Sequence, residues 1–135
     1  MAEIAEDCQM SAANLYRYFE NKQEIGAQLA SHCLSESIEK LRQVLAGKNL
    51  TAAELFQAFV MAVLQDTYER WSKMPRINEL VQMIITERQD VIQRFAEAKR
   101  GLLVKLLEDA NRTGEFDVAE PVVTAESILT AIKMF

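Results

Sequence analysis

Apolar residues recur every three to four positions along most of this chain, which is the spacing of amphipathic helices. Gly47 marks the end of the first long stretch. Thr51 and Glu54 then form the capping-box pattern that begins a second amphipathic stretch. The pattern predicts long helices over 21–46 and 51–73. The apolar stripe of the first contains Ile25, Leu29, Leu34, Ile38, Leu41 and Leu45.

Three further helices are expected after these two. Pro75 ends or restarts the second helix, and apolar positions then recur through 77–88 and 91–112. The pattern leaves open whether the helix is kinked or completely broken at Glu87–Asp90. Asp90 is a candidate N-cap of the helix that follows. A last helix begins at Pro121. The chain has only four Gly and two Pro for turns, so we predict an all-α fold.

The N-terminal residues have a different organisation from the long helices. Residues 3–8 and 11–19 are predicted to be two short helices joined by a tight link, which is the arrangement of a helix-turn-helix. Leu15 and Phe19 lie four residues apart and share the inward face of the second helix, whereas Arg17 lies on another side. The second helix therefore offers a polar face to a partner.

The run IAEDCQMSAANLYRYFENKQEI, over 22 of the 135 residues, resembles the DNA-binding signature of the TetR family of bacterial transcriptional regulators. The positions that carry the resemblance are Ile4, Ala5, Ser11, Leu15, Tyr16, Tyr18, Phe19, Asn21 and Lys22. Gln9 stands in the turn where the family has glycine. The family's helix before this motif and its final helix have no counterpart here, so we expect the chain to be truncated at both ends.

The resemblance implies two regions. Residues 1–46 would form the helix-turn-helix DNA-binding region with a connecting helix, and residues 47–135 a helical effector-binding and dimerisation domain. The implied function is a ligand-responsive transcriptional regulator, more often a repressor, that binds a palindromic DNA operator as a homodimer and is released by a small-molecule effector. Such a protein would work in the cytoplasm.

The recognition helix supplies the candidate DNA-binding residues by this resemblance. Arginine is suited to guanine and asparagine to adenine in the major groove, and the tyrosines and the lysine would hold phosphates. Alternatively, the tyrosines only fill the core of the motif. The candidates are Ser11, Ala12, Ala13, Asn14, Tyr16, Arg17, Tyr18 and Lys22.

Aromatic and polarizable side chains in the larger region are candidates for a ligand pocket. They are Phe56, Phe59, Val63, Tyr68, Trp71, Met83 and Phe95, and for each of them ordinary core packing is the alternative. The last helix would contribute to a dimer interface, or its apolar face would pack within its own domain. Its candidates are Val122, Ala125, Ile128, Leu129 and Ile132.

Charge and motif content limit the remaining function classes. The net charge of −5 argues against a nucleic-acid binder and supports an alternative, a helical protein-interaction module without DNA binding. No nucleophile–base set, phosphate loop or metal-ligand spacing is present, so we expect no enzyme activity, cofactor or metal. No run approaches the length of a membrane span, so no membrane partner is expected.

Overall fold

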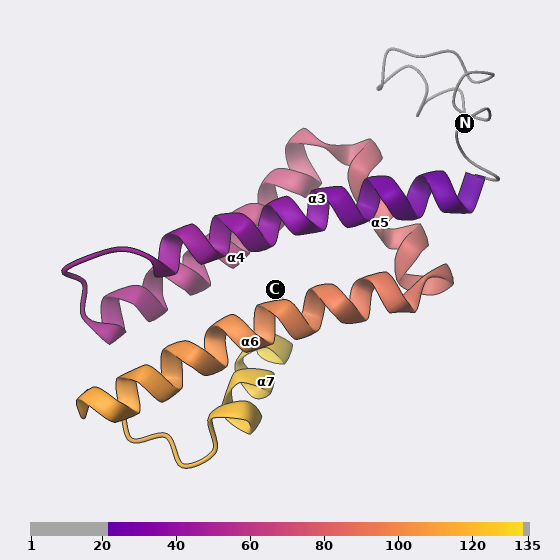
Figure 1. Cartoon of the computed structure of the whole chain (residues 1–135). Coiled ribbons are helices and arrows are strands. Elements are labelled where there is room, and N and C mark those ends of the chain that lie inside the picture. Colours follow the sequence, from indigo (N-terminus) through magenta and orange to yellow (C-terminus); the bar gives the residue numbers. More distant parts are fainter. Residues whose placement is uncertain (1–21, 134–135) are drawn as a thin grey trace.

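The computed structural model describes residues 22–133, which form five helices joined by short connections (Figure 1). These are α3 (Lys22–Leu45), α4 (Ala52–Lys73), α5 (Pro75–Glu87), α6 (Gln89–Thr113) and α7 (Pro121–Ile132). No strand occurs within 22–133, so the all-α prediction is confirmed. In the same part of the chain, no helix is both long and apolar enough to span a membrane.

Helix α3 packs against three other helices, α4, α5 and α6. Its buried face contains the predicted large residues Ile25, Leu34, Ile38 and Leu41, which are 7% exposed or less. Ala27 and Ala30 are equally buried, and their small side chains let α5 and α6 approach the backbone of α3. The covered face therefore extends along nearly the whole helix.

The capping box predicted at the start of α4 is present. The Thr51 hydroxyl accepts a hydrogen bond from the Glu54 backbone N–H at 3.2 Å, and the Glu54 carboxylate accepts one from the Thr51 N–H at 2.9 Å. Both bonds satisfy N–H groups that the helix itself leaves without partners. In the preceding loop, Asn49 has a φ of 64°, a left-handed conformation that asparagine tolerates.

The junction between α5 and α6 is a complete break rather than a kink. Arg88 ends α5 and precedes α6, with φ −130° and ψ 67° that no helix accommodates. The prediction that Asp90 caps the next helix was wrong, because α6 already begins at Gln89. The Asp90 carboxylate instead accepts hydrogen bonds from the Arg88 guanidinium.

Two groups of buried apolar residues hold the helices together. The larger one joins α3, α4, α6 and α7 through Ile38, Leu41, Phe59, Val63, Leu103, Leu106, Leu107, Ala125 and Leu129. The smaller one joins α3, α5 and α6 through Ala27, Ala30, Leu34, Val81, Ile84 and Val91. Phe95 packs against both groups. Helix α3 also contributes to both, so its position depends on the whole domain.

The loop between α6 and α7 folds back in a defined way. Gly114 ends α6 with a φ of 82°, a left-handed conformation that glycine adopts without strain. The Asn111 side-chain amide donates to the Val118 carbonyl at 2.8 Å and accepts from the Val118 N–H at 2.9 Å. These bonds direct the chain so that α7 packs against α6 (Figure 1).

Replacing Phe59 by alanine should destabilise the protein by about 3–5 kcal/mol, because its fully buried ring leaves a cavity at the centre of the larger core. Met61→Ala is the matched control on the same helix. Met61 is 57% exposed, so its loss should change the free energy of unfolding by less than about 0.5 kcal/mol. Urea unfolding at one protein concentration measures both, and equal losses would contradict this placement of Phe59.

Candidate functional site

The described residues begin where the predicted DNA-binding motif ends. Of the candidate DNA-binding residues, Ser11, Ala12, Ala13, Asn14, Tyr16, Arg17 and Tyr18 lie outside the described residues. Lys22 is the first residue of α3. Helix α3 therefore joins this motif to the rest of the domain. The contacts between α3 and the other helices are candidates for transmitting a signal between the two parts.

One set of contacts ties the first turns of α3 to the α5–α6 break, and we call it the junction cluster: Glu24, Arg88 and Asp90. The Arg88 guanidinium donates to both Asp90 carboxylate oxygens at 3.0 and 3.2 Å and to Glu24 Oε2 at 3.3 Å. Arg88 holds the pKa of Asp90 below its ordinary value of 3.8. The pKa of Glu24 is also lowered, first by its hydrogen bond from Gln28 and then by Arg88.

A second polar cluster ties the middle of α3 to α4. The buried Ser37 hydroxyl donates to Asp66 Oδ2 at 2.9 Å, and Arg70 Nη1 donates to the same oxygen at 3.2 Å. Lys40 Nζ lies 4.0 Å from Asp66 Oδ1. The half-buried carboxylate of Asp66 is therefore contacted by one hydroxyl and two cationic groups. Because Ser37 and Lys40 belong to α3, these contacts fix the register of α3 on α4.

The cysteine and histidine of the described part do not form a reactive site. Burial raises the pKa of the Cys33 thiol, so it remains protonated and unreactive at neutral pH. The His32 ring is 72% exposed, 3.6 Å from Glu36 on the same helix. Among residues 22–133, no group of three or more metal-ligating side chains lies close enough to hold an ion.

The seven candidate ligand-binding residues do not line one cavity in the structure. Phe59 and Val63 are buried in the larger core, and Phe56 packs edge-on against Phe116 with ring centroids 6.5 Å apart. Tyr68 and Trp71 are 69% and 67% exposed. Tyr68 lies nine positions after Phe59, about 180° around the helix, and so on the opposite side.

The two other candidates, Met83 and Phe95, lie on α5 and α6. Met83 packs against the smaller core. Two grooves, described below, lie between α3 and α6. Phe95 lines the smaller one, and the other six candidates line neither of them. Lys99 Nζ lies 4.6 Å from the centroid of the Phe95 ring. Burial, with smaller contributions from the nearby Lys133 and Arg70, lowers the pKa of Lys99 to about 8.

The two grooves between α3 and α6 adjoin each other at Arg42, which lines both. The larger, of about 370 Å³, lies between the C-terminal halves of α3 and α6 and the first turn of α4. The smaller, of about 310 Å³, runs along the middle of α3 and the first half of α6. Sequence reasoning did not identify these grooves, because their walls combine residues more than 50 positions apart.

The five candidate dimer residues on α7 lie on one side of the helix, within about 120° of one another. Ala125 and Leu129 are buried in the larger core, and Ile128 and Ile132 pack partly against it. These four residues pack wholly or partly against the core of their own domain, and their place in an intersubunit surface stays a prediction. Val122 is 49% exposed, and its neighbour Val123 is 53% exposed.

Two family matches place the chain among known proteins. Residues 52–135 match the family described as "Tetracyclin repressor-like, C-terminal domain", and residues 1–29 match "Bacterial regulatory proteins, tetR family". The chain belongs to the TetR family. Its resemblance to that family, noted from the motif alone, is thereby confirmed and extends over the helical region as well. No curated protein and no solved structure matches the chain.

TetR membership fixes the broad function and organisation. The chain is a DNA-binding transcriptional regulator, with a helix-turn-helix unit followed by a helical domain. Within that organisation, α3 directly follows the DNA-binding motif, and the junction cluster and Asp66 connect α3 to the C-terminal domain. These polar residues are the functional candidates that sequence reasoning missed.

Arg88→Gln should lower the thermal unfolding midpoint at pH 7, because it removes the bonds from Arg88 to Glu24 and Asp90. Carboxylates with lowered pKa values stabilise the fold above their unfolded pKa values of about 4. The difference from wild type should vanish as the pH falls through the lowered values. Arg94→Gln, which loses two hydrogen bonds to Asp90 within α6 and none that joins two helices, is the control. A difference that persists at pH 2.5 would contradict the assignment.

Proposed function

We propose that this TetR-family chain is a ligand-responsive repressor that binds a palindromic operator as a homodimer in the cytoplasm. The observation that carries the proposal is the match of both the DNA-binding and the C-terminal families to one chain. The arrangement of α3 supports it, since this helix follows the motif and packs against three helices of the C-terminal domain. A change in that domain would therefore be transmitted to the motif.

Direct readout of DNA is assigned to the recognition helix. Ser11 caps it, Ala12 and Ala13 allow close approach to the major groove, and Asn14 and Arg17 contact base edges. Tyr16, Tyr18 and Lys22 bind phosphates and set the register on the duplex. In a dimer, two such helices would enter successive major grooves roughly 34 Å apart.

The response to a ligand is assigned to a shift of α3. Arg88 lies at the break between α5 and α6 and bonds to Glu24 near the start of α3. A ligand that changes the angle at this break would move the start of α3, and the DNA-binding motif with it. A coupling free energy of about 1–3 kcal/mol is typical of such systems.

Dimerisation is assigned to the exposed face of α7. Val122 and Val123 are about half exposed in the first turn of this helix, whereas Ala125 and Leu129 further along it are buried. An interface centred on these valines would leave the packing of Ala125 and Leu129 within each subunit unchanged. The remaining area of this interface would come from other segments of the subunit.

A protein-interaction module without DNA binding remains the second candidate. Met61, Tyr68 and Trp71 are each more than half exposed on α4, and they lie within about 80° of one another around the helix. The net charge of −5 also favours a partner other than DNA. Binding through such an apolar face would depend little on salt, whereas DNA binding weakens steeply as salt rises.

Selection of randomised duplex DNA at low and moderate salt tests the proposal. We expect a two-fold symmetric site, with affinity that falls steeply as salt rises. Arg17→Ala should weaken binding to that site by about 1–3 kcal/mol, whereas Lys48→Ala, in the exposed α3–α4 loop, should leave it unchanged. Recovery of unselected sequence at both salts would overturn the proposal in favour of the interaction module.

A further inference from the structure

The larger groove between α3 and α6 is lined mainly by apolar side chains. Its volume is about 370 Å³. Sites of this size, at the lower end of the range that small-molecule pockets span, accommodate a ligand of modest length. The leucines of its wall come from four segments: α3, the α3–α4 loop, α4 and α6. They are Leu45, Leu50, Leu55, Leu102 and Leu106. Such a wall suits the hydrocarbon part of a ligand.

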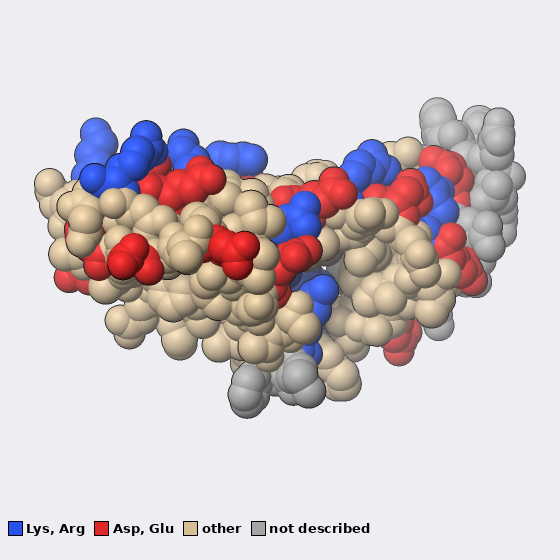
Figure 2. All heavy atoms as spheres, turned by 90° about the horizontal axis from the view of Figure 1, so that it is seen from below, with Lys and Arg blue, Asp and Glu red and all other residues tan. Residues whose placement is uncertain are grey.

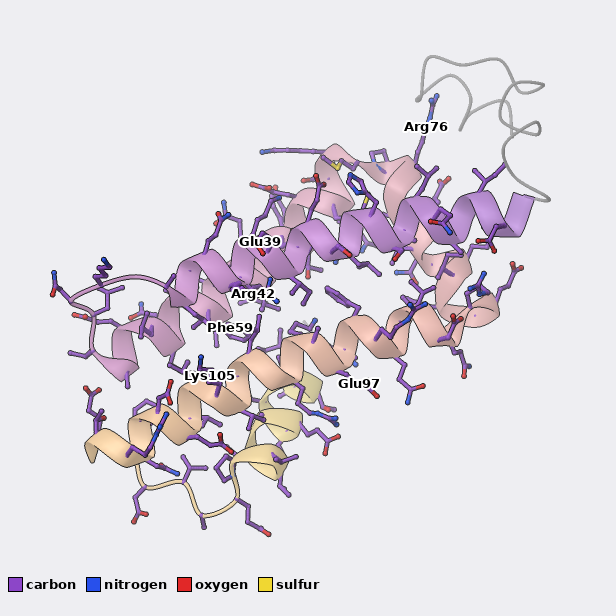
Figure 3. The ribbon with its side chains drawn as sticks, in the orientation of Figure 1. Glu39, Arg42, Phe59, Arg76, Glu97 and Lys105 are labelled. Atoms are coloured by element: carbon purple, nitrogen blue, oxygen red, sulfur yellow. The ribbon has the colours of Figure 1, made fainter. Side chains whose placement is uncertain are left out.

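Two cationic side chains also line this groove, Arg42 from α3 and Lys105 from α6. Figure 3 shows both at the space between the two helices. Within the described part of the chain, Lys105 has no ion pair or hydrogen bond from its ammonium group. Arg42 pairs with Glu39 on its own helix at 2.7 Å, and both of those side chains are more than half exposed. Water screens such a pair, so an anionic ligand can replace it at small cost.

The carboxylates that line the groove already have partners. Asp109 pairs with Arg112 one turn later on α6. Glu115 Oε2 accepts a hydrogen bond from the Ala52 backbone N–H at 2.6 Å, at the start of α4. Both acids stay charged, but within the described part of the chain neither forms an ion pair with Arg42 or Lys105, so the two cations are open to a ligand.

The smaller groove continues on the other side of Arg42 with a similar balance. Ser31, Ser35 and Arg94 line it with apolar residues, and none of its lining residues is acidic. Figure 2 shows Lys and Arg side chains gathered along one edge at the left end of the molecule, the end that holds the α3–α4 loop in Figure 1. Despite the negative net charge of the chain, cationic side chains line both grooves.

We propose that the larger groove binds an amphipathic anion, with its acidic head between Arg42 and Lys105 and its hydrocarbon tail along the leucines. The inference rests on the proposed ligand response and names the chemical class of the effector. A ligand in this position contacts α3 and α6 together. Its binding therefore changes how α3 lies on the domain, at the opposite end of that helix from the junction cluster.

Calorimetric titration of the full chain with decanoate, below its micelle concentration, tests the site. 1-Decanol is the neutral probe with the same tail, and decyltrimethylammonium is the cationic one. We expect decanoate to bind more tightly than decanol and the cationic probe to bind weakest. Absence of decanoate binding, or an equal affinity for all three probes, would overturn the proposal.

Variants of Lys105 locate the acidic head. Lys105→Gln should weaken decanoate binding about tenfold and leave decanol binding unchanged, whereas Lys105→Arg should retain decanoate affinity. The control is Lys73→Gln, which removes an exposed charge on α4 and should change neither. Ala46→Phe, at a small residue of the groove wall, should reduce the binding of both probes. Equal decanoate affinity in wild type and Lys105→Gln would overturn the assignment.

The same titrations separate this inference from the broader proposal. If decanoate binds as expected but does not change the affinity for the selected DNA site, the groove is an anion site and its role as the effector site is wrong. If decanoate does not bind although a symmetric DNA site is selected, the regulator stands and the effector class proposed here is overturned.

Discussion

The burial of one face of α3 is the interaction on which the rest of the structure depends. This helix supplies residues to both apolar cores, from Ala27 and Ala30 in the smaller to Ile38 and Leu41 in the larger. Because most of the stability of a protein helix comes from packing of its amphipathic face, the position of α3 is set by the surfaces it covers. The DNA-binding motif directly precedes α3 in the sequence, so the domain core holds the helix to which that motif is joined.

Polar contacts then select one position of α3 among those that burial permits. Hydrophobic contact is non-directional, whereas the bonds from Ser37 to Asp66 and from Arg88 to Glu24 require specific distances. The two contacts lie at different points along α3 and involve α4 and the α5–α6 break. A ligand that strains either contact has a defined route to the motif, without any change in the apolar cores.

The amphipathic pattern predicted the helices well, because burial of one face imposes a period of 3.6 residues. The capping box at Thr51 was also local and was confirmed.

Ala27 and Ala30 were missed because small residues carry a weak apolar signal. Tyr68 and Trp71, predicted to line a pocket, are exposed in the structure, since aromatic character does not reveal which face a helix exposes. Asp66, Arg88 and the α3–α6 grooves depend on pairs distant in sequence.

We expect α3 and the C-terminal domain to form one cooperative unit. Native-state hydrogen exchange on the full chain tests this cooperativity, since amides that open only by global unfolding share one free energy of opening. Amides from Ile25 to Leu41 should show the same protection as those around Phe59 in α4 and Leu103 in α6. Markedly weaker protection along α3 alone would contradict it, because α3 would then open independently of the domain.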